Sequence, residues 1–243
     1  MGKYTFYLGV RSPALIAAGE ALKTRGYPVV DRPCPAVTHL LLPVPTAKDL
    51  NIAAILEKLP SGVTVLGGFL PDLPGYRCID LLKNDTYLAG NAAITAHCAI
   101  AEALPRMCVT MQNCPVLIIG WGRIGKCLAP LLRCLGAKVT VAARKESARA
   151  MAQALGFQTT LLEKAPLEDY RLIYNTVPAP MLSAEDLACC HRCLKIDLAS
   201  VRGLEGEDVI WARGLPGKNT PESSGQLIAR MAIRLLPEKE AAP

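Results

Sequence analysis

The chain has 243 residues, of which 51% are apolar and 5% aromatic, and its net charge is +6. This composition excludes a largely disordered protein, apart from the tail PEKEAAP, and favours an α/β fold in one large domain or two small ones over a β-sandwich. The sequence has no run of Lys and Arg that would indicate nucleic-acid binding, and no apolar run reaches the ~18 residues that span a bilayer. Because the N-terminus lacks the apolar segment of a signal peptide, we expect a cytoplasmic protein.

The first part of the chain alternates strand and helix patterns, which predicts a small α/β domain. A helix over 12–26 begins at Ser12, a favourable N-cap followed by Pro. A second helix is predicted over 46–59, with Thr46 as its N-cap. Strands are predicted around these helices over 3–10, 27–30, 38–44 and 62–69. The Pro- and Gly-rich segment 71–90 is predicted as a loop.

A helix over 91–104 is predicted to connect this part to a second α/β part. Strands are predicted there over 115–120, 138–143, 171–176, 194–200 and 208–212. Helices are predicted after the first strand and over 145–156, 183–190 and 221–238. This alternation is typical of a parallel sheet with helices on both faces.

A glycine-rich loop, GWGRIG, separates the first strand of the second part from its helix. Gly120 permits a tight turn, Gly122 lets the backbone approach a pyrophosphate, and Gly125 lets the helix pack closely on the strand. The helix N-terminus offers N–H groups and partial positive charge to phosphates. We therefore predict a dinucleotide site that includes Arg123 and Ile124. The alternative is a doubly wound domain that has lost its ligand.

The end of the next strand indicates which dinucleotide binds. An NAD site places Asp or Glu there to accept hydrogen bonds from the ribose hydroxyls. Here the sequence reads VTVAARKES, so Arg144 and Lys145 stand at that point and Ser147 follows. Because these groups pair with phosphate, we predict NADP, with all three residues on the 2′-phosphate. The alternative is a pair of solvated surface cations.

Two further segments follow strands of the second part and are predicted to line the nicotinamide-ribose side of the cofactor. Ligands of open α/β folds bind at the carboxyl ends of the strands, where both segments lie. Their residues are Asn175, Thr176, Val177 and Pro178 in the first segment and Asp197, Leu198 and Ala199 in the second.

The ten cysteines lie mostly in apolar segments, where we expect small, buried and reduced side chains. The segment CCHRC places Cys190 and Cys193 at CxxC spacing, with His191 between them. A structural zinc site needs four ligands, and no second pair follows at motif spacing. We therefore predict no metal site.

Several segments together resemble the A subunit of dipicolinate synthase. They are the glycine loop with VTVAAR, then YNTVPAPML, IDLAS and GLPGKNTPESSGQLIA, and they cover about residues 91–236 in order. The resemblance implies a fold similar to D-2-hydroxyacid dehydrogenases. A flavodoxin-like α/β domain would occupy 1–90 and a Rossmann NADP-binding domain 91–225. A C-terminal helix over 226–243 would pack back on the first domain.

The resemblance also implies an activity. The family supplies the last step to dipicolinate in endospore-forming bacteria, oxidising a dihydrodipicolinate-type dicarboxylate with NADP together with a flavoprotein-like B subunit. For this chain it implies an NADP-dependent oxidoreductase of sporulation with a small anionic dicarboxylate substrate. We also expect a homo-oligomer and no nucleic-acid or membrane partner.

The segment NAAITAHCAI differs from the family pattern. Asn91 and Thr95 remain, whereas Ile94 and His97 stand where the family has Pro and Glu. We predict that His97 replaces the carboxylate as the proton-transfer group, since imidazole titrates near neutral pH. Arg202, followed by Gly, is similar to the substrate-binding Arg of D-2-hydroxyacid dehydrogenases and is predicted to bind a carboxylate. The predicted catalytic residues are His97, Asn91, Thr95 and Arg202.

Two alternatives to this function stay open. The replaced carboxylate also fits a non-catalytic or redox-sensing NADP-binding protein. Another 2-hydroxyacid-type dehydrogenase on the same scaffold is the second alternative, and it would need a His–carboxylate pair.

Overall fold

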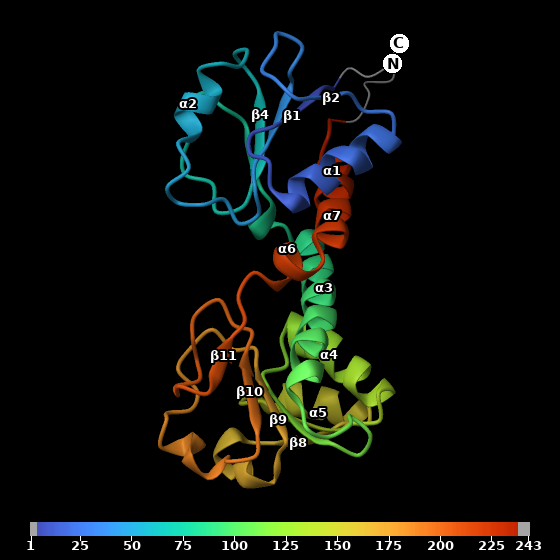
Figure 1. Ribbon diagram of the computed structural model, residues 1–243, viewed down its shortest axis with the longest axis vertical. Coiled ribbons are helices and arrows are strands. Elements are labelled where there is room, and N and C mark those ends of the chain that lie inside the picture. The colour runs from blue at the N-terminus through green and yellow to red at the C-terminus, as the bar shows by residue number, and fades with distance from the viewer. Residues whose placement is uncertain (1–3, 238–243) are drawn as a thin grey trace. The chain divides into compact units, whose positions relative to one another are not determined.

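Two parallel sheets organise the chain, as the sequence predicts, in a computed structural model that describes residues 4–237 (Figure 1). The chain divides into two units: the first comprises residues up to 91 and from 216 onward, and the second comprises 92–215. Helix α3, Asp85–Ala103, runs through the boundary. The predicted C-terminal helix over 221–238 ends earlier than predicted, at Arg234, and the tail after Pro237 lies outside the described residues.

The sheet of the first unit has the order β2-β1-β3-β4-β5, with every neighbouring pair parallel. This order is that of flavodoxin-like folds. Its strands are β1 (Phe6–Leu8), β2 (Val29–Val30), β3 (His39–Leu41), β4 (Thr64–Gly67) and β5 (Cys78–Asp80). Strand β5 lies in the segment predicted as a loop, because its half-exposed side chains give no strand pattern.

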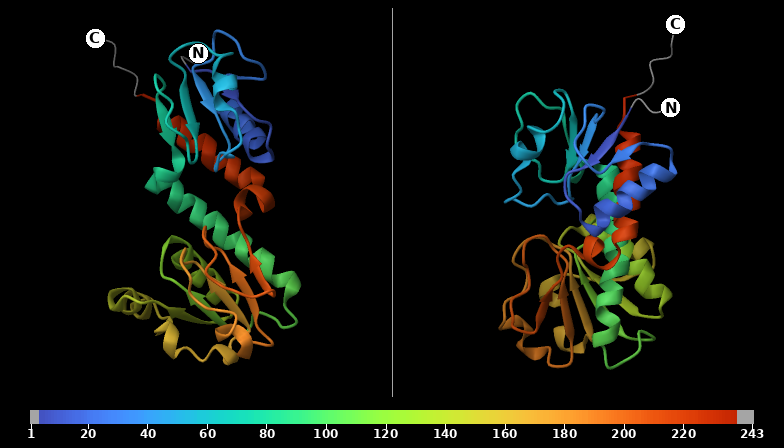
Figure 2. Two further views of the ribbon diagram at one scale, coloured as in Figure 1. Left: turned by 90° about the vertical axis from the view of Figure 1, so that its left-hand side faces the viewer. Right: turned by 45° about the horizontal axis from the view of Figure 1, so that its top comes forward.

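Helices α1 (Pro13–Thr24) and α7 (Pro221–Arg234) pack side by side in the first unit (Figures 1 and 2). The predicted cap is present, since Ser12 Oγ accepts from Leu15 N at 3.3 Å. The two helices meet where α7 has Gly225, because a Cβ there would lie 2.5 Å from Ala14 O. The end of the chain thus contributes to the core of the first unit.

The predicted helix over 46–59 is wrong in its start and length. Helix α2 spans only Ile52–Leu56, with Asn51 as its N-cap. Thr46 is buried and its hydroxyl instead donates to Pro43 O at 2.8 Å and accepts from Gly68 N at 3.3 Å. Thr46 therefore joins the two loops that follow β3 and β4 instead of capping a helix.

Helix α3 begins six residues before the predicted start at Asn91. Asn84 provides the start, because its Oδ1 accepts from Tyr87 N at 3.0 Å. Gly90, which suggests a loop in the sequence, lies inside the helix, and a Cβ there would be 2.7 Å from Leu227 Cδ1 of α7. The glycine permits close helix packing rather than a turn.

The sheet of the second unit has the order β11-β10-β9-β6-β7-β8, again parallel throughout. Renumbered from the first strand of the unit, this is the Rossmann order 3-2-1-4-5-6 read from the far edge. The strands are β6 (Pro115–Ile119), β7 (Lys138–Ala142), β8 (Gln158–Thr160), β9 (Leu172–Asn175), β10 (Leu194–Asp197) and β11 (Val209–Trp211). Strand β8 was not predicted.

Helices α4 (Arg123–Cys134) and α5 (Glu146–Ala154) and the second half of α3 pack on this sheet. Tyr174 on β9 is fully buried and donates to Ala99 O of α3 at 2.8 Å. The apolar faces of these helices and strands form the main core of the unit, which fixes β6 and α4 around the glycine loop.

Two predictions for the remaining segments differ from the structure. The predicted helix over 183–190 is only a 3₁₀ turn, because the hydrogen bonds between Ser183 and Asp186 start a turn that ends at Cys190. A short helix, α6 (Leu215–Asn219), precedes α7 without having been predicted. The 3₁₀ helices are η1 (Leu81–Lys83), η2 (Leu104–Arg106), η3 (Leu162–Lys164), η4 (Leu167–Asp169) and η5 (Asp186–Cys189).

Candidate nucleotide-binding site

The chain leaves β6 through a left-handed turn at Gly120. This residue has a φ of +104°, and a Cβ there would lie 2.5 Å from Thr176 Oγ1. Its N–H donates to Ala142 O at the end of β7, at 2.9 Å. Both the backbone conformation and the close approach therefore require glycine.

Gly125 and Gly122 differ in the space around them: Gly125 is closely packed and Gly122 is open. A Cβ on Gly125 would lie 2.3 Å from Gly120 O, so the first turn of α4 packs directly on the loop backbone. A Cβ on Gly122 would meet nothing within 4 Å. Gly122 is the N-cap of α4, and no side chain among residues 4–237 caps this helix of 12 residues. Open space thus adjoins a helix N-terminus whose first N–H groups lack helical partners, which fits a pyrophosphate.

The side chain of Trp121, in the middle of the loop, packs into the core. It is 9% exposed, and its ring contacts Phe157 edge-to-face with centroids 5.7 Å apart. Its indole Nε1 is buried and has no hydrogen-bond partner among the residues described. Trp121 therefore supports the loop by packing, a role that the glycine pattern does not indicate.

The turn after β7 carries the residues predicted for the 2′-phosphate. Arg144, Lys145 and Ser147 are all exposed there. Glu146, the first residue of α5, is the one carboxylate of this turn and is exposed as well. Lys145 is the N-cap of α5, and in the described part of the chain no side chain caps that helix either. The structure thus brings the three predicted residues together at the edge of the sheet where the glycine loop lies.

Arg149, in the first turn of α5, supports this turn and was missed by sequence reasoning. Its Nη1 donates to Ala143 O at 2.7 Å and to Arg144 O at 2.8 Å. One guanidinium thus holds two successive carbonyls where β7 ends. A cation one turn into the following helix is the sequence signal that would have indicated it.

The segments after β9 and β10 are joined by a buried side-chain network. Asn175 and Asp197 are fully buried, and Asn175 Nδ2 donates to Asp197 Oδ1 at 3.0 Å. Asn175 also closes its own turn, since its Oδ1 accepts from Val177 N at 3.0 Å and its Nδ2 donates to Val177 O at 3.0 Å. These side chains shape the segments from inside.

Asp197 binds the backbone of the loop that follows β10. Its Oδ1 accepts from Ala199 N at 3.0 Å, and its Oδ2 accepts from Gly203 N at 2.6 Å and Leu204 N at 2.9 Å. Gly203 must be glycine here, because a Cβ would lie 2.4 Å from Ala179 O. With the bond from Asn175, the carboxylate accepts hydrogen bonds from four protein groups.

The other predicted residues of these segments have different exposures. Thr176 is half-buried against the glycine loop, and its hydroxyl donates to Ile119 O at 2.9 Å. Pro178 is exposed, whereas Leu198 and Ala199 are buried. Val177 Cγ2 would lie 2.8 Å from a Cβ on Gly120. Of the two segments, the one after β9 therefore adjoins the glycine loop directly.

Arg202 is exposed but is engaged within its own loop. Its Nε donates to Leu204 O at 3.0 Å and its Nη2 donates to Gly206 O at 2.7 Å. The guanidinium thus stabilises the loop between β10 and β11.

The predicted catalytic residues of helix α3 lie on two different faces of the helix. Thr95 is buried and Asn91 is half-buried, one turn before it. His97 is exposed, as expected of a residue about 200° around the helix from Thr95. The structure therefore brings Asn91 and Thr95 together on one face and leaves His97 on another, where solvent reaches it.

The CCHRC segment contains a pair of close thiols rather than a ligand set. Cys189 Sγ and Cys190 Sγ lie 3.8 Å apart. Burial raises the pKa of Cys190 to about 11 and that of Cys193 to about 12, so both thiols are protonated at neutral pH. Over residues 4–237 no group of three or more His, Cys, Asp or Glu is arranged to hold a metal ion.

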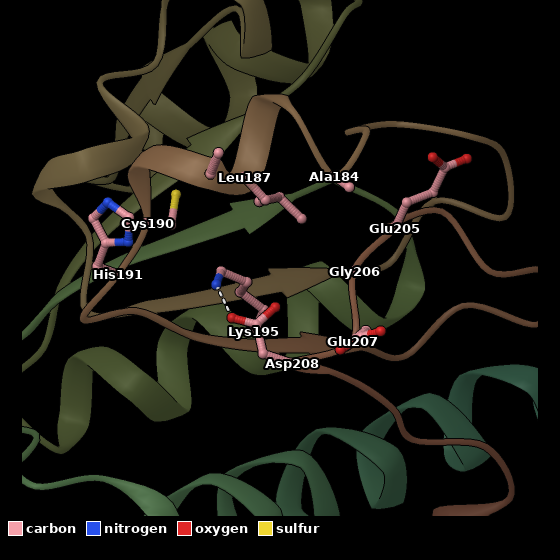
Figure 3. A pocket seen from close by; sticks show the side chains of 10 residues that line it. Ala184, Leu187, Cys190, His191, Lys195, Glu205, Gly206, Glu207 and Asp208 are labelled. Atoms are coloured by element: carbon pink, nitrogen blue, oxygen red, sulfur yellow. Dashed lines mark hydrogen bonds and ion pairs between the residues drawn. The ribbon is translucent and has the colours of Figure 1, made fainter.

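Two hollows lie away from the glycine loop, near the amino ends of strands in the second unit. The first, of about 280 Å³, adjoins β10 and β11, and Figure 3 shows Lys195 and Asp208 facing each other beside it. Lys195 is buried and forms an ion pair with Asp208. The second hollow has a volume of about 440 Å³. Neither is lined by a residue predicted to bind the cofactor.

A search of the described helices finds none with the length and apolar character needed to cross a membrane.

No family model matches the chain. The A subunit of dipicolinate synthase from Bacillus subtilis is 29% identical over 177 residues, which are 68% of this chain and 59% of that protein. The chain thus matches less than two thirds of that relative's length.

Solved structures share the fold at lower identity. The A subunit of dipicolinate synthase from Bacillus halodurans has a TM-score of 0.83 and 23% identity, covering 99% of both chains. The corresponding dipicolinate synthase structure from Bacillus subtilis has a TM-score of 0.75 and 18% identity, covering 97% of this chain and 96% of that one. D-lactate dehydrogenase from Salmonella has a TM-score of 0.57 and 13% identity, covering 99% and 98%. The chain is therefore similar in sequence to the dipicolinate synthase A subunit, as predicted, and shares the fold of these dipicolinate synthase and D-lactate dehydrogenase structures.

Proposed function

We propose that the protein is an NADP-dependent oxidoreductase of the dipicolinate synthase A type, which oxidises a dihydrodipicolinate-like dicarboxylate to dipicolinate. One observation carries the proposal: open space at Gly122 combines with Arg144 at a strand end where an NAD site has a carboxylate. The sequence similarity to the A subunit of dipicolinate synthase supports the substrate class.

The residues present fit NADP. In the proposal, the N–H groups at the start of α4 bind the pyrophosphate, since a Cβ on Gly122 would meet no atom of another described segment within 4 Å. Arg144, Lys145 and Ser147 bind the 2′-phosphate, because all three are exposed on one turn. Thr176, beside the glycine loop, lines the nicotinamide-ribose side with its neighbours.

Asn175 and Asp197 act by positioning in this proposal. Their side chains are buried and bonded to the protein, so they fix the segments that adjoin the cofactor instead of contacting it. Pro178, Leu198 and Ala199 then contribute through the shape of those segments.

Bound at this site, NADP⁺ would supply the acceptor for one hydride, the C4 atom of its nicotinamide ring. The dihydro substrate loses that hydride from one ring atom and a proton from another, which leaves an aromatic pyridine ring. His97 is proposed as the proton acceptor, and Arg202 is proposed to bind a substrate carboxylate through the guanidinium nitrogen that its loop does not use. Asn91 and Thr95 are proposed to position the substrate.

Calorimetric titration of the protein with NADPH and NADH tests the cofactor. We expect NADPH to bind at least tenfold more tightly than NADH. Binding of neither dinucleotide at millimolar concentration would refute the proposal. An assay at 340 nm with NADP⁺ and a dihydrodipicolinate preparation then tests the reaction, which should produce NADPH and dipicolinate in equal amounts.

The role of His97 has its own test. The variant His97→Gln should lose at least 100-fold in kcat while binding NADPH normally, because only proton transfer is removed. His191→Gln is a matched control, since His191 is also exposed. Equal loss of activity in both variants, or in neither, would remove His97 from the mechanism.

A homo-oligomer and a complex with a flavoprotein-like B subunit are further parts of the proposal, supported by the similarity to a protein named as one component of a synthase. Light scattering of the purified protein, alone and mixed with a flavoprotein-like B subunit, tests both. We expect an oligomer alone and a larger stable complex in the mixture.

Two observations favour a second candidate, an NADP-binding protein without catalysis. Arg202 already donates two hydrogen bonds within its loop, and the Asp197 carboxylate is enclosed by backbone donors. Tight NADPH binding, with no hydride transfer to or from any cyclic dicarboxylate even when the B subunit is present, would establish this alternative.

A further inference from the structure

The larger hollow of the second unit is lined by arginines from three separate segments. It has a volume of about 440 Å³. Arg106 ends η2, Arg171 directly precedes β9, and Arg192 lies two residues before β10. Each thus lies at the amino ends of the strands, whereas the glycine loop and Arg144 lie at the carboxyl ends.

Two of these arginines lack a counter-charge. Arg106 pairs with Glu102 at 2.9 Å and donates to Glu102 O at 2.7 Å. Across residues 4–237, the side chains of Arg171 and Arg192 form neither ion pairs nor hydrogen bonds. A guanidinium carries its charge at any physiological pH, so both positive charges remain available to a ligand.

The carboxylate in the lining is already neutralised. Asp208 lines this hollow as well as the smaller one, and it forms an ion pair with the buried Lys195, as Figure 3 shows. The Lys195 side chain is 3% exposed, so its ammonium depends on this carboxylate. Asp208 therefore does not compensate the arginines.

The rest of the lining is apolar or neutral. Met107, Val109 and Leu194 contribute hydrophobic side chains, and Val109 is 48% exposed. Cys193 adds a thiol whose pKa burial raises to about 12, so it carries no negative charge at neutral pH. A ligand that suits this hollow has an apolar body and negative charges for two guanidiniums.

We propose that the hollow is a second ligand site, which binds a small aromatic dicarboxylate through Arg171 and Arg192. Guanidinium and carboxylate pair through two parallel hydrogen bonds, and an aromatic ring would supply the apolar body that contacts Met107 and Leu194 in the lining. The volume lies within the ~300–1,000 Å³ typical of small-molecule sites. This site does not depend on the proposed reaction. The one connection between the second site and the proposed reaction, that dipicolinate would be a ligand of this class, rests on the proposed function.

Calorimetric titration of the full chain with benzene-1,3-dicarboxylate and pyridine-2,6-dicarboxylate, with and without saturating NADPH, tests the site. We expect saturable binding that NADPH does not displace. Arg171→Ala and Arg192→Ala should each weaken it about tenfold or more. Arg171→Lys should also weaken it, because ammonium cannot form the paired hydrogen bonds. The control is Lys138→Ala, which removes an exposed cation outside the lining at the amino end of β7.

Succinate and inorganic phosphate are the comparison ligands, and both should bind at least tenfold more weakly than the aromatic dicarboxylates. Equal affinity for either would overturn the assignment of an aromatic ligand. Dicarboxylate binding that is absent, displaced by NADPH or unchanged in both Ala variants would overturn the site itself. Because NADPH affinity is measured in the same variants, a failure of the second site is distinguished from a failure of the nucleotide site.

Discussion

Asn175 and Asp197 end neighbouring strands in the same register, and the amide of the first donates to the carboxylate of the second at 3.0 Å. Both side chains are fully buried. The pair fixes the turn after β9 and the loop after β10 from within. Two residues that look like ligand contacts in the sequence therefore hold the edge of the sheet in shape.

Replacing Asp197 should destabilise the second unit. Asp197→Ala leaves three buried backbone donors and the Asn175 amide without their acceptor, which we expect to cost about 3 kcal/mol or more of unfolding free energy. Urea unfolding measures the effect. Ser200→Ala, an exposed change in the same loop, is the control and should cost less than ~0.5 kcal/mol. A loss below ~1 kcal/mol in Asp197→Ala would contradict the network.

Two glycines of the loop should separate binding from folding. Gly122→Ala adds a methyl group that meets no protein atom within 4 Å, so we expect it to cost at most ~1 kcal/mol of stability and to weaken NADPH binding about tenfold. Gly125→Ala places its Cβ 2.3 Å from Gly120 O and should cost ~3 kcal/mol or more. Thermal unfolding and NADPH titration of the two variants give both quantities. Normal NADPH affinity in Gly122→Ala would argue against the pyrophosphate position.

Arg144 should decide the choice of dinucleotide. Arg144→Ala is expected to weaken NADPH binding at least tenfold and to leave NADH binding unchanged, because only NADPH has the 2′-phosphate. Lys138→Ala removes a cation at the opposite end of the same strand and should change neither affinity. If NADPH and NADH affinities fall together in Arg144→Ala, the residue does not read the 2′-phosphate.

Arg149 should affect the preference for NADPH over NADH indirectly, by holding the turn that carries Arg144. Arg149→Lys keeps the charge but replaces the guanidinium that binds Ala143 O and Arg144 O. We expect the preference for NADPH over NADH to fall by about threefold to tenfold. The free energy of unfolding should fall by ~1 kcal/mol. Titration with both dinucleotides and urea unfolding measure the two effects. A full NADPH preference in this variant would show that the turn keeps its shape without Arg149.

His39 should make the first unit less stable in mild acid. It is 5% exposed, and burial, followed by the nearby charge of Arg77, lowers its pKa from 6.5 to about 4. Between these values the unfolded chain binds a proton that the folded chain does not, so stability falls as the pH drops from 6.5 toward 4. We expect a contribution of about 2 kcal/mol lost between pH 7 and pH 5, measured by urea unfolding.

The variant His39→Gln tests this assignment. It should lose the acid-dependent part of the stability curve between pH 7 and pH 5, whatever its stability at pH 7. The exposed His97 provides the matched variant His97→Gln, which should keep the curve of the unmodified protein. An unchanged curve in His39→Gln would assign the acid sensitivity to other groups.

Features that depend on neighbouring residues follow from the amino-acid sequence alone. The strand–glycine–helix succession predicted the turn at Gly120 and the close packing at Gly125, because φ preferences and helix termini act over a few residues. The basic turn at Arg144 was readable for the same reason. The two α/β parts also followed from the alternation of apolar patterns.

Features that depend on contacts between distant segments become visible only in the folded chain. Gly90 lies inside a helix at a point where Leu227, far away in the sequence, leaves no room for a Cβ, and Thr46 links two loops instead of capping a helix. Asn175 and Asp197 turned inward because burial on adjacent strands satisfies their polar groups with each other and with loop backbone. Local propensity cannot encode such contacts, since they exist only after the strands have aligned.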